Sequence, residues 1–99
     1  MEEKLLKIIR KYGVNNQQRK LAEEVFELQE AIIEYRYVEV YRGSPAEKYH
    51  KEHIAEELAD VTVMLLQFKE YYHIDGNDIL KIMNEKIDRQ LQRIEEGKW

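Results

Sequence analysis

Two segments of this chain carry the same arrangement of acidic side chains. Residues 21–28 read LAEEVFEL and residues 54–61 read IAEELADV, so one pattern of apolar residues, alanine and acids occurs twice, 33 positions apart. Each copy holds two carboxylates three positions apart, which a helix places on one side, about one turn from each other. The two pairs are Glu24 with Glu27 and Glu57 with Asp60. Two such helices packed together would gather four negative charges, and that arrangement is unfavourable unless cations bind among them.

The chemistry of these four acids fits a hard divalent cation. Oxygen ligands without cysteine favour Mg²⁺, with Mn²⁺ as the alternative, over zinc. Mg²⁺ usually binds through one or two carboxylates and completes its shell with waters and substrate phosphates. Four carboxylates therefore predict two or more ions and a phosphate-bearing substrate. A solvated acidic face explains most single Glu-x-x-Glu pairs, but the repetition of the pattern on two segments favours a metal site.

Apolar periodicity and turn residues predict that four helices position these acids. The expected helices cover residues 2–12, a segment from a cap at Asn15 or Asn16 to about Arg42, a segment from Pro45 to about His73, and roughly Asp78 to Glu95. Ser44 is expected to cap the third helix, with Pro45 in its first turn and Glu47 completing a capping box. We therefore expect a single domain over residues 1–99 with an all-α fold, a four-helix bundle.

Helical projection relates the two acid segments and predicts an oligomer. At about 100° per residue, the first acid of each pair lies about 60° from the apolar stripe of its helix and the second about 120° from it. The third expected helix has a second apolar side, made by Ala55, Ala59, Thr62, Val63 and Leu66. A helix that is apolar on two sides is buried from two sides, and a 99-residue chain has little material for this. Homo-oligomerisation, most simply a symmetric dimer, is the expected explanation.

Composition argues against several classes of function. The net charge of −4 gives no support for nucleic-acid binding. No apolar stretch is long enough to span a bilayer, and the N-terminus does not resemble a signal peptide. The chain contains no cysteine, which excludes disulfides, thiolate metal sites and a cysteine nucleophile. We expect a cytoplasmic protein with no nucleic-acid or membrane partner.

A basic ridge on the fourth expected helix suits phosphate binding. Lys86, Arg89 and Arg93 form this ridge, at spacing i, i+3, i+7 beside an apolar stripe. Arginine offers a fork of donors to phosphate and lysine a compact charge, so a ridge that faced the four acids would bind a polyphosphate. The alternative is a solvated face on which these side chains pair with neighbouring acids, and the spacing alone favours neither.

A second metal chemistry uses Glu-x-x-His pairs, as in di-iron helix bundles. The chain has two such pairs, Glu47 with His50 and Glu70 with His73. Both fall on the third expected helix, 23 residues apart, which corresponds to about 35 Å along a helix axis. They cannot converge within one chain, so the sequence disfavours a di-iron site.

Three motifs together resemble those of a known enzyme family. Glu23-Glu24-Val25-Phe26-Glu27, followed by Glu57-Leu58-Ala59-Asp60, resembles the EExxE…ExxD signature of the MazG-type all-α nucleoside triphosphate pyrophosphohydrolases, and Asn84-Glu85-Lys86-Ile87-Asp88-Arg89 resembles their downstream Asn-x-Lys…Arg segment. The resemblance covers roughly residues 15–95. It implies a helical bundle, assembled as a homodimer or homotetramer, that cleaves a nucleoside triphosphate between the α- and β-phosphates and releases the monophosphate and pyrophosphate.

The resemblance also implies roles for individual residues. The expected Mg²⁺ ligands are Glu24, Glu27, Glu57 and Asp60, and the expected phosphate-binding residues are Asn84, Lys86 and Arg89. Gln90 stands where many members have a second arginine, so Arg93 is expected to substitute from the next turn. A water activated by the bound metal would attack the α-phosphorus. Glu23 or Glu56, each about 40° beyond the metal-binding face, would take its proton or steady the coordination shell. The expected catalytic residues are Glu23, Glu24, Glu27 and Glu56.

Two other functions stay open on the sequence. One is a narrower pyrophosphohydrolase of the same superfamily, specific for dUTP, dCTP or phosphoribosyl-ATP. The other is a non-catalytic helical interaction module in which the acids only solvate the bundle. The metal dependence of stability separates this module from an enzyme, because a metal that binds only the folded state must stabilise it.

Overall fold

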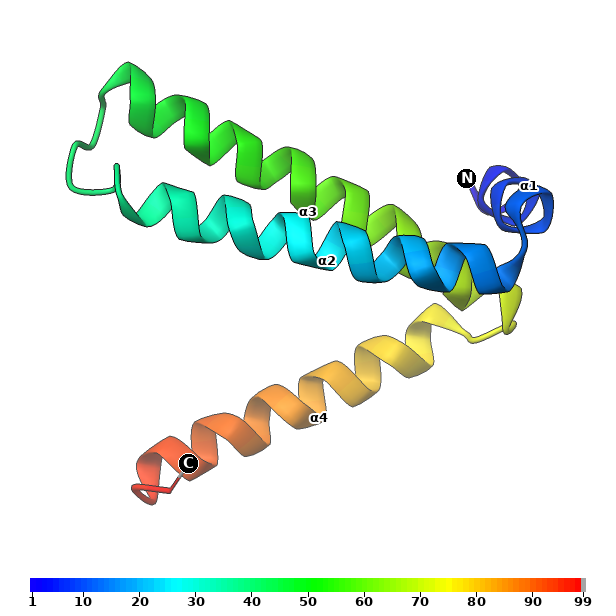
Figure 1. Cartoon of the computed structure of the whole chain (residues 1–99). Coiled ribbons are helices and arrows are strands. Elements are labelled where there is room, and N and C mark those ends of the chain that lie inside the picture. Colours follow the sequence, from blue (N-terminus) through cyan, green and yellow to red (C-terminus); the bar gives the residue numbers. More distant parts are fainter. Residues whose placement is uncertain (99) are drawn as a thin grey trace.

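Four α-helices and no strand make up residues 1–98, the part of the chain that the computed structural model describes. The helices are α1 (Glu2–Tyr12), α2 (Val14–Arg36), α3 (Pro45–Tyr71) and α4 (Gly76–Glu95) (Figure 1). The prediction of an all-α fold with four helices is confirmed. No helix within residues 1–98 is both long enough and apolar enough to cross a membrane.

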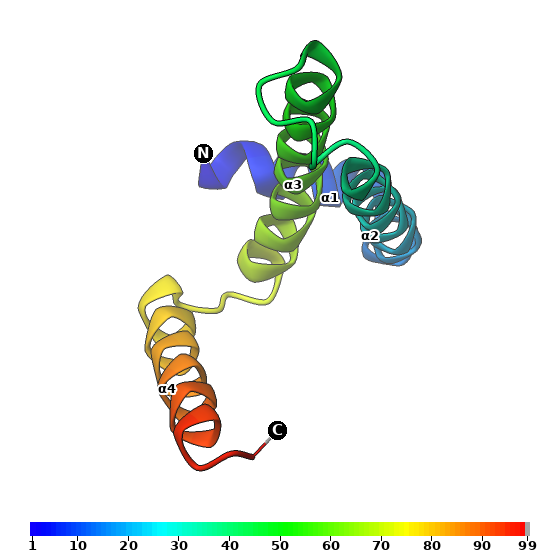
Figure 2. The ribbon, with the colours of Figure 1, turned by 90° about the vertical axis from the view of Figure 1, so that its left-hand side faces the viewer.

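The two longest helices form an antiparallel hairpin. α2 has 23 residues and α3 has 27, and the two lie side by side (Figures 1 and 2). α1 crosses the open end of this hairpin and packs against α3 and α2. The buried apolar side chains are Leu5 and Ile9 from α1, Ala31 from α2, and Val61 and Met64 from α3. This small core holds together the hairpin that carries both acid segments.

The turn between α2 and α3 is closed by a hydrogen-bonded cap. The Ser44 hydroxyl accepts from the backbone N–H of Glu47 at 3.1 Å, so the predicted N-cap is confirmed. The Glu47 carboxylate accepts from the backbone N–H of Gly43 at 3.2 Å and from the hydroxyl of Tyr35 at 3.1 Å. The bond from Gly43, followed by the bond from Tyr35, lowers the pKa of Glu47. Desolvation, followed by the bond to Glu47, raises the pKa of Tyr35.

The C-terminus of α2 differs from the prediction. α2 ends at Arg36 rather than near Arg42. Residues 37–44 instead form a series of turns. Gly43, within this segment, has a φ of 84°, which is accessible chiefly to glycine. Tyr41 lies in this turn and is 64% exposed.

The predicted cap of α2 at Asn15 or Asn16 is wrong. α2 begins at Val14, directly after Gly13, whose φ of 92° turns the chain from α1 into α2 without a loop. The Asn16 side chain instead donates to the backbone carbonyl of Tyr12 at 2.8 Å, at the C-terminus of α1. The asparagine side chain therefore hydrogen-bonds a backbone carbonyl at the end of α1 rather than a backbone N–H at the beginning of α2.

The connection between α3 and α4 is short. α3 ends at Tyr71, and His73, where we expected the end of the helix, has a φ of 55°. The Asp75 carboxylate accepts from the backbone N–H of Asn77 at 2.7 Å and caps α4. Glu47 and His50 lie near the N-terminus of α3, whereas Glu70 lies in its last turn and His73 just beyond it, so within residues 1–98 the two Glu-x-x-His pairs lie at opposite ends of one continuous helix and do not converge.

α4 does not pack along the other three helices. It projects away from the hairpin in both views, and none of its residues is buried (Figures 1 and 2). The residues of its apolar stripe, Leu80, Met83, Ile87, Leu91 and Ile94, are 55%, 51%, 53%, 56% and 58% exposed. Within residues 1–98, three helices therefore pack together and the fourth has no partner. Completion of the bundle by other copies of the chain stays a prediction.

Candidate metal centre

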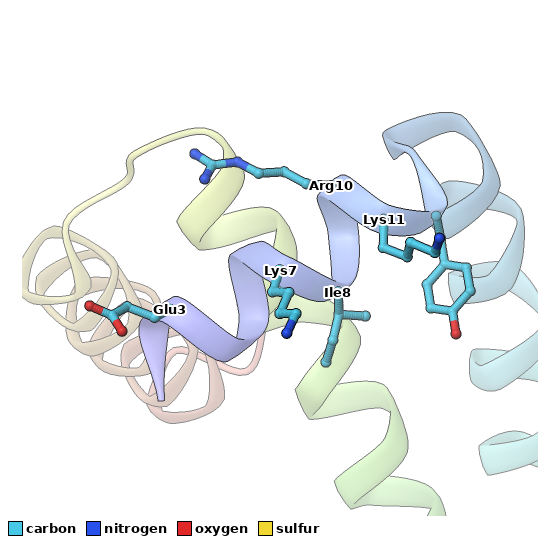
Figure 3. A pocket seen from close by; sticks show the side chains of 6 residues that line it. Glu3, Lys7, Ile8, Arg10 and Lys11 are labelled. Atoms are coloured by element: carbon cyan, nitrogen blue, oxygen red, sulfur yellow. The ribbon is translucent and has the colours of Figure 1, made fainter.

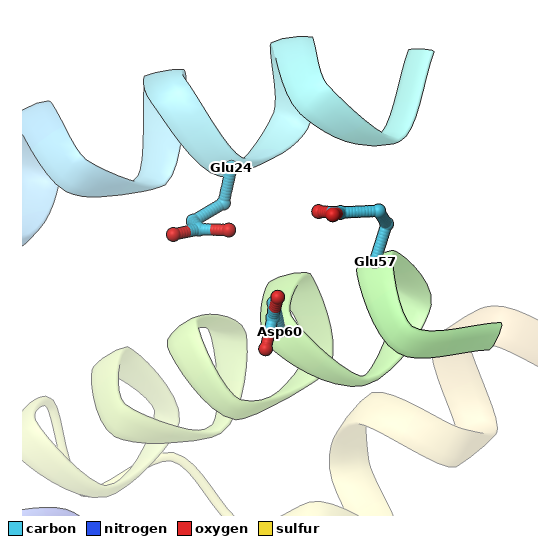
Figure 4. Close-up of side chains that lie close together, drawn as sticks. All are labelled: Glu24, Glu57 and Asp60. Carbon is cyan, nitrogen blue, oxygen red and sulfur yellow. The ribbon is translucent and has the colours of Figure 1, made fainter. Parts of the chain in front are cut away.

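Three of the four predicted metal ligands come together between α2 and α3. Glu24 projects from α2 toward Glu57 and Asp60 on α3 (Figure 4). Carboxylate oxygens of these three residues, which we call the acid cluster, lie within 4.8 Å of one another. The antiparallel hairpin creates the cluster, because it brings two segments that are 33 positions apart in the sequence to the same level.

Two of these carboxylates are buried and incompletely satisfied. Glu24 is 7% exposed and Glu57 is 9% exposed, whereas Asp60 is open to solvent. The Oε2 atoms of Glu24 and Glu57 are shielded from solvent and have no hydrogen-bond partner among the residues that the structure describes. A buried carboxylate oxygen without a donor is strongly unfavourable. Several carboxylate oxygens close together are the ligands that Mg²⁺ takes, so the residues present fit the implied metal.

Each buried glutamate is paired through its other oxygen with a basic side chain one turn earlier. Lys20 Nζ lies 3.2 Å from Glu24 Oε1, and His53 Nε2 lies 3.9 Å from Glu57 Oε1. The hydrogen bond to Glu24, followed by the charge of that carboxylate, raises the pKa of Lys20. The His53 ring also stacks on Tyr49, with ring centroids 6.4 Å apart. Neither basic residue is among the predicted site residues; their signal in the sequence is the i, i+4 spacing to the acid, which both repeats share.

Most of the chain matches one protein family. A family model of the MazG nucleotide pyrophosphohydrolase domain matches residues 13–94. The chain belongs to this family. The matched residues include α2, α3 and nearly all of α4, and therefore both acid segments and the basic ridge. Searches of curated proteins and of solved structures gave no match.

The fourth predicted ligand of this MazG-family chain lies at the rim of the acid cluster. Glu27 is exposed and is not among the carboxylates that converge. The charge of Glu24, followed by partial desolvation and the charge of Glu57, nevertheless raises the pKa of Glu27. The structure therefore brings three of the four acids together and leaves the fourth within their electrostatic field.

Neither predicted proton acceptor belongs to the acid cluster. The Glu56 side chain is 77% exposed, and its Oε2 lies 4.0 Å from Nδ1 of His53. Glu23 lines a surface hollow of about 490 Å³ on α2, together with Phe26 and Glu27. Both carboxylates are accessible to solvent and adjacent in sequence to cluster residues. Their catalytic role stays a prediction.

The residues predicted to bind phosphate lie on α4. Lys86 and Arg89 line a hollow of about 250 Å³, and Asn84 and Arg93 are exposed on the same helix. Within residues 1–98 the basic ridge forms no ion pair, so the neighbouring acids do not neutralise it. Because α4 does not pack along α2 or α3, a single chain does not bring the ridge to the acid cluster. The sequence identified the ridge, but helical spacing contains no information on what the ridge faces.

A larger hollow lies on α1 and has the wrong chemistry for a MazG-family site. It encloses about 650 Å³ and is lined by Glu3, Lys7, Ile8, Arg10, Lys11 and Tyr12 (Figure 3). This lining offers one carboxylate and three basic side chains, which cannot form a hard-cation site. α1 also lies outside the residues that match the family. The acid cluster, rather than this hollow, is the candidate site.

Proposed function

We propose that this protein is a Mg²⁺-dependent nucleoside triphosphate pyrophosphohydrolase that acts in the cytoplasm as a homodimer or homotetramer. It would hydrolyse a ribo- or deoxyribonucleoside triphosphate to the monophosphate and pyrophosphate. The observation that carries the proposal is the pair of buried, unpartnered oxygens, Glu24 Oε2 and Glu57 Oε2, within a group of three carboxylates. Acids that served only to solvate a helix would lie at the surface.

The acid cluster would supply the metal ligands. Glu24, Glu57 and Asp60 would hold Mg²⁺, or Mn²⁺ in its place, and Glu27 would join them from the next turn of α2. Such an ion neutralises phosphate charge and lowers the pKa of a water so that the water attacks at neutral pH. Lys20 pairs with Oε1 of Glu24, and His53 lies 3.9 Å from Oε1 of Glu57, so the Oε2 atom of each glutamate would be available to the metal.

Glu23 or Glu56 would accept the proton of the water that attacks the α-phosphorus. Both side chains are exposed, so the proton can pass on to solvent. Both residues stay candidates, because Glu56 Oε2 lies 4.0 Å from Nδ1 of His53, beyond hydrogen-bond distance.

The basic ridge on α4, together with Asn84, would bind the phosphates. Lys86, Arg89 and Arg93 would neutralise the charge that develops on the departing pyrophosphate. This requires the ridge to lie beside an acid cluster, which the arrangement of a single chain does not provide. We infer that α4 packs on a neighbouring copy, which would bury its apolar stripe and place the ridge beside an acid cluster of the assembly.

Product analysis tests this proposal. The protein is incubated with each of the four common ribonucleoside and four deoxyribonucleoside triphosphates, in about 5 mM Mg²⁺ (an excess for weak sites) or in EDTA, and the products are separated by anion-exchange chromatography. Monophosphate plus pyrophosphate, formed only with Mg²⁺, would support the proposal, whereas diphosphate plus orthophosphate would reject it. Turnover restricted to dCTP, or to dUTP or phosphoribosyl-ATP in separate assays, would narrow the substrate. No turnover, with no effect of Mg²⁺ on stability, would favour the interaction module.

A further inference from the structure

A hydrogen-bonded pair of glutamines is buried in the same α2–α3 interface as the acid cluster. Gln17 on α2 is 7% exposed and Gln67 on α3 is 2% exposed. Gln17 Nε2 donates to Gln67 Oε1 at 2.8 Å, and the two Nε2 atoms lie 3.9 and 3.7 Å from the sulfur of Met64. Glutamine is seldom buried this deeply. The proposed reaction uses neither residue, so the pair needs a different explanation.

The glutamine pair and the acid cluster are successive layers of one interface. Gln17 lies seven residues before Glu24 on α2, and Gln67 lies seven residues after Asp60 on α3. Seven residues are two helical turns, or about 10.5 Å along a helix axis. Because α2 and α3 run antiparallel, one register pairs both layers. Sliding one helix along the other would separate the glutamines and the acids together.

The acid cluster does not favour this register without a metal. Its carboxylates repel one another when no cation lies between them. Few apolar residues of the two helices are buried, namely Ala31, Val61 and Met64. A slipped register would leave two buried amides without partners, which is strongly unfavourable. In coiled coils, a single buried polar contact of this kind fixes the register of two helices.

We propose that the Gln17–Gln67 hydrogen bond sets the register of α2 against α3 and thereby positions Glu24 opposite Glu57 and Asp60. Both glutamines are positioning residues, because neither is in the acid cluster. The effect on metal binding rests on the proposed function, whereas the effect on register does not. The two can therefore be measured separately.

The double variant Gln17→Leu/Gln67→Leu tests the register. It leaves no buried group unpaired, so its melting temperature in EDTA should stay at or above that of wild type. The chain lacks cysteine, so cysteines introduced at the exposed positions Arg19 and Glu52 can carry spin labels, one on each helix. Pulsed electron paramagnetic resonance then measures the distance between the two spin labels. Labelled protein is diluted with unlabelled protein, so that the measured distance is the one within a single chain. Wild type should give a single narrow distribution of label-to-label distances. The double leucine variant should give a broader distribution, or one whose centre is displaced by up to about one helical turn, roughly 5.4 Å.

A matched control removes a hydrogen bond at the other end of the hairpin. Tyr35→Phe deletes the 3.1 Å bond to Glu47 without touching the glutamine layer, and it should keep the wild-type distance. A double leucine variant with the wild-type distribution would overturn the proposal. So would a displacement of the same size in Tyr35→Phe, because the register would then depend on any polar contact rather than on this one.

Mn²⁺ titration by calorimetry tests the consequence for the metal. The double leucine variant should bind Mn²⁺ about 10- to 100-fold more weakly than wild type, as for other residues that orient metal ligands. Unchanged Mn²⁺ affinity in a variant with a displaced distance would overturn the positioning role. If wild type itself binds no Mn²⁺, the proposed function fails, and the spin-label distances still decide whether the glutamines set the register.

Discussion

Lys20 and His53 hold equivalent positions on the two helices of the hairpin. Each lies four residues before a buried glutamate and contacts the Oε1 atom of that glutamate, at 3.2 Å for Lys20 and 3.9 Å for His53. The two residues are 33 positions apart, which is also the separation of the acid segments, so the repeat extends one turn beyond the acids. In both pairs the Oε2 atom stays without a partner. The repeat therefore places a nitrogen-bearing side chain beside each buried glutamate, as well as supplying candidate ligands.

Lys20→Met should raise the pKa of Glu27 further in the metal-free protein. The charge of Glu24 is the main cause of the raised pKa of Glu27, and the charge of Lys20 opposes it. Removing the ammonium removes that opposition. An NMR titration of the side-chain carboxyl carbons measures the change. Lys20→Arg keeps the charge and should leave Glu27 near its wild-type value. An unchanged pKa in Lys20→Met would mean that this ammonium has no influence on the acids.

Glu27→Gln should stabilise the metal-free protein at neutral pH. The folded-state pKa of Glu27 is raised, chiefly by the charge of Glu24, so its ionised form is less favourable in the folded than in the unfolded chain. This penalty is absent below the unfolded-state pKa, near 4.5, and complete above the folded-state pKa, so wild-type stability falls as pH rises through that window.

Urea unfolding in EDTA at neutral and acidic pH measures this difference. Glu27→Gln should be more stable than wild type at neutral pH, and the advantage should disappear well below the ordinary glutamate pKa of 4.5. Glu34→Gln, at an exposed position farther along α2, is the matched control and should show no such pH-dependent gain. A Glu27→Gln protein that unfolds more easily than wild type at neutral pH would contradict this electrostatic account.

The sequence predicted what depends on local spacing and missed what depends on packing. The helical repeat placed Glu24 and Glu57 on equivalent faces, and the hairpin brings them together. The sequence repeat did not distinguish buried Glu24 from exposed Glu27, because the packing of α2 against α3 decides which of the two side chains is covered. Periodicity also could not place α4, since the stripe around Ile87 looks the same whether it faces its own chain or a neighbouring copy. The end of α2 at Arg36 was missed because no glycine or proline precedes Gly43 in the turn, so the sequence gives no break before that residue.

Asp60→Asn should abolish turnover and leave the metal-free fold intact. Asp60 contributes the exposed carboxylate of the acid cluster, and an amide is a poorer Mg²⁺ ligand. We expect activity to fall by at least about 100-fold, with a melting temperature in EDTA equal to or above that of wild type because repulsion is relieved. Glu52→Gln, on an exposed part of the same helix, should retain activity. Substantial turnover by Asp60→Asn would remove this residue from the ligand set.

Mg²⁺ should raise the melting temperature of the wild-type protein, and EDTA should reverse the effect. A ligand that binds only the folded state at about 100 times its Kd stabilises that state by about 2.7 kcal/mol. Differential scanning calorimetry across a Mg²⁺ series measures the increase. Glu24→Gln/Glu57→Gln removes both buried charges and should flatten the response. An equal response in this variant would place the stabilising ion elsewhere.

Ile87→Lys should dissociate the assembly and reduce activity although it alters no acid. Ile87 lies in the middle of the unpartnered apolar stripe of α4 and is 53% exposed in a single chain. If another copy covers this stripe, the variant buries an uncompensated charge, which destabilises an interface by about 3–5 kcal/mol. Analytical ultracentrifugation should then find a smaller species than wild type, with activity reduced in parallel at the same concentration. Gln92→Lys introduces the same charge at an exposed polar position of α4 and should leave both properties unchanged. A fully assembled, active Ile87→Lys protein would mean that the stripe is not an interface and that the basic ridge reaches the acid cluster by movement of α4 within its own chain.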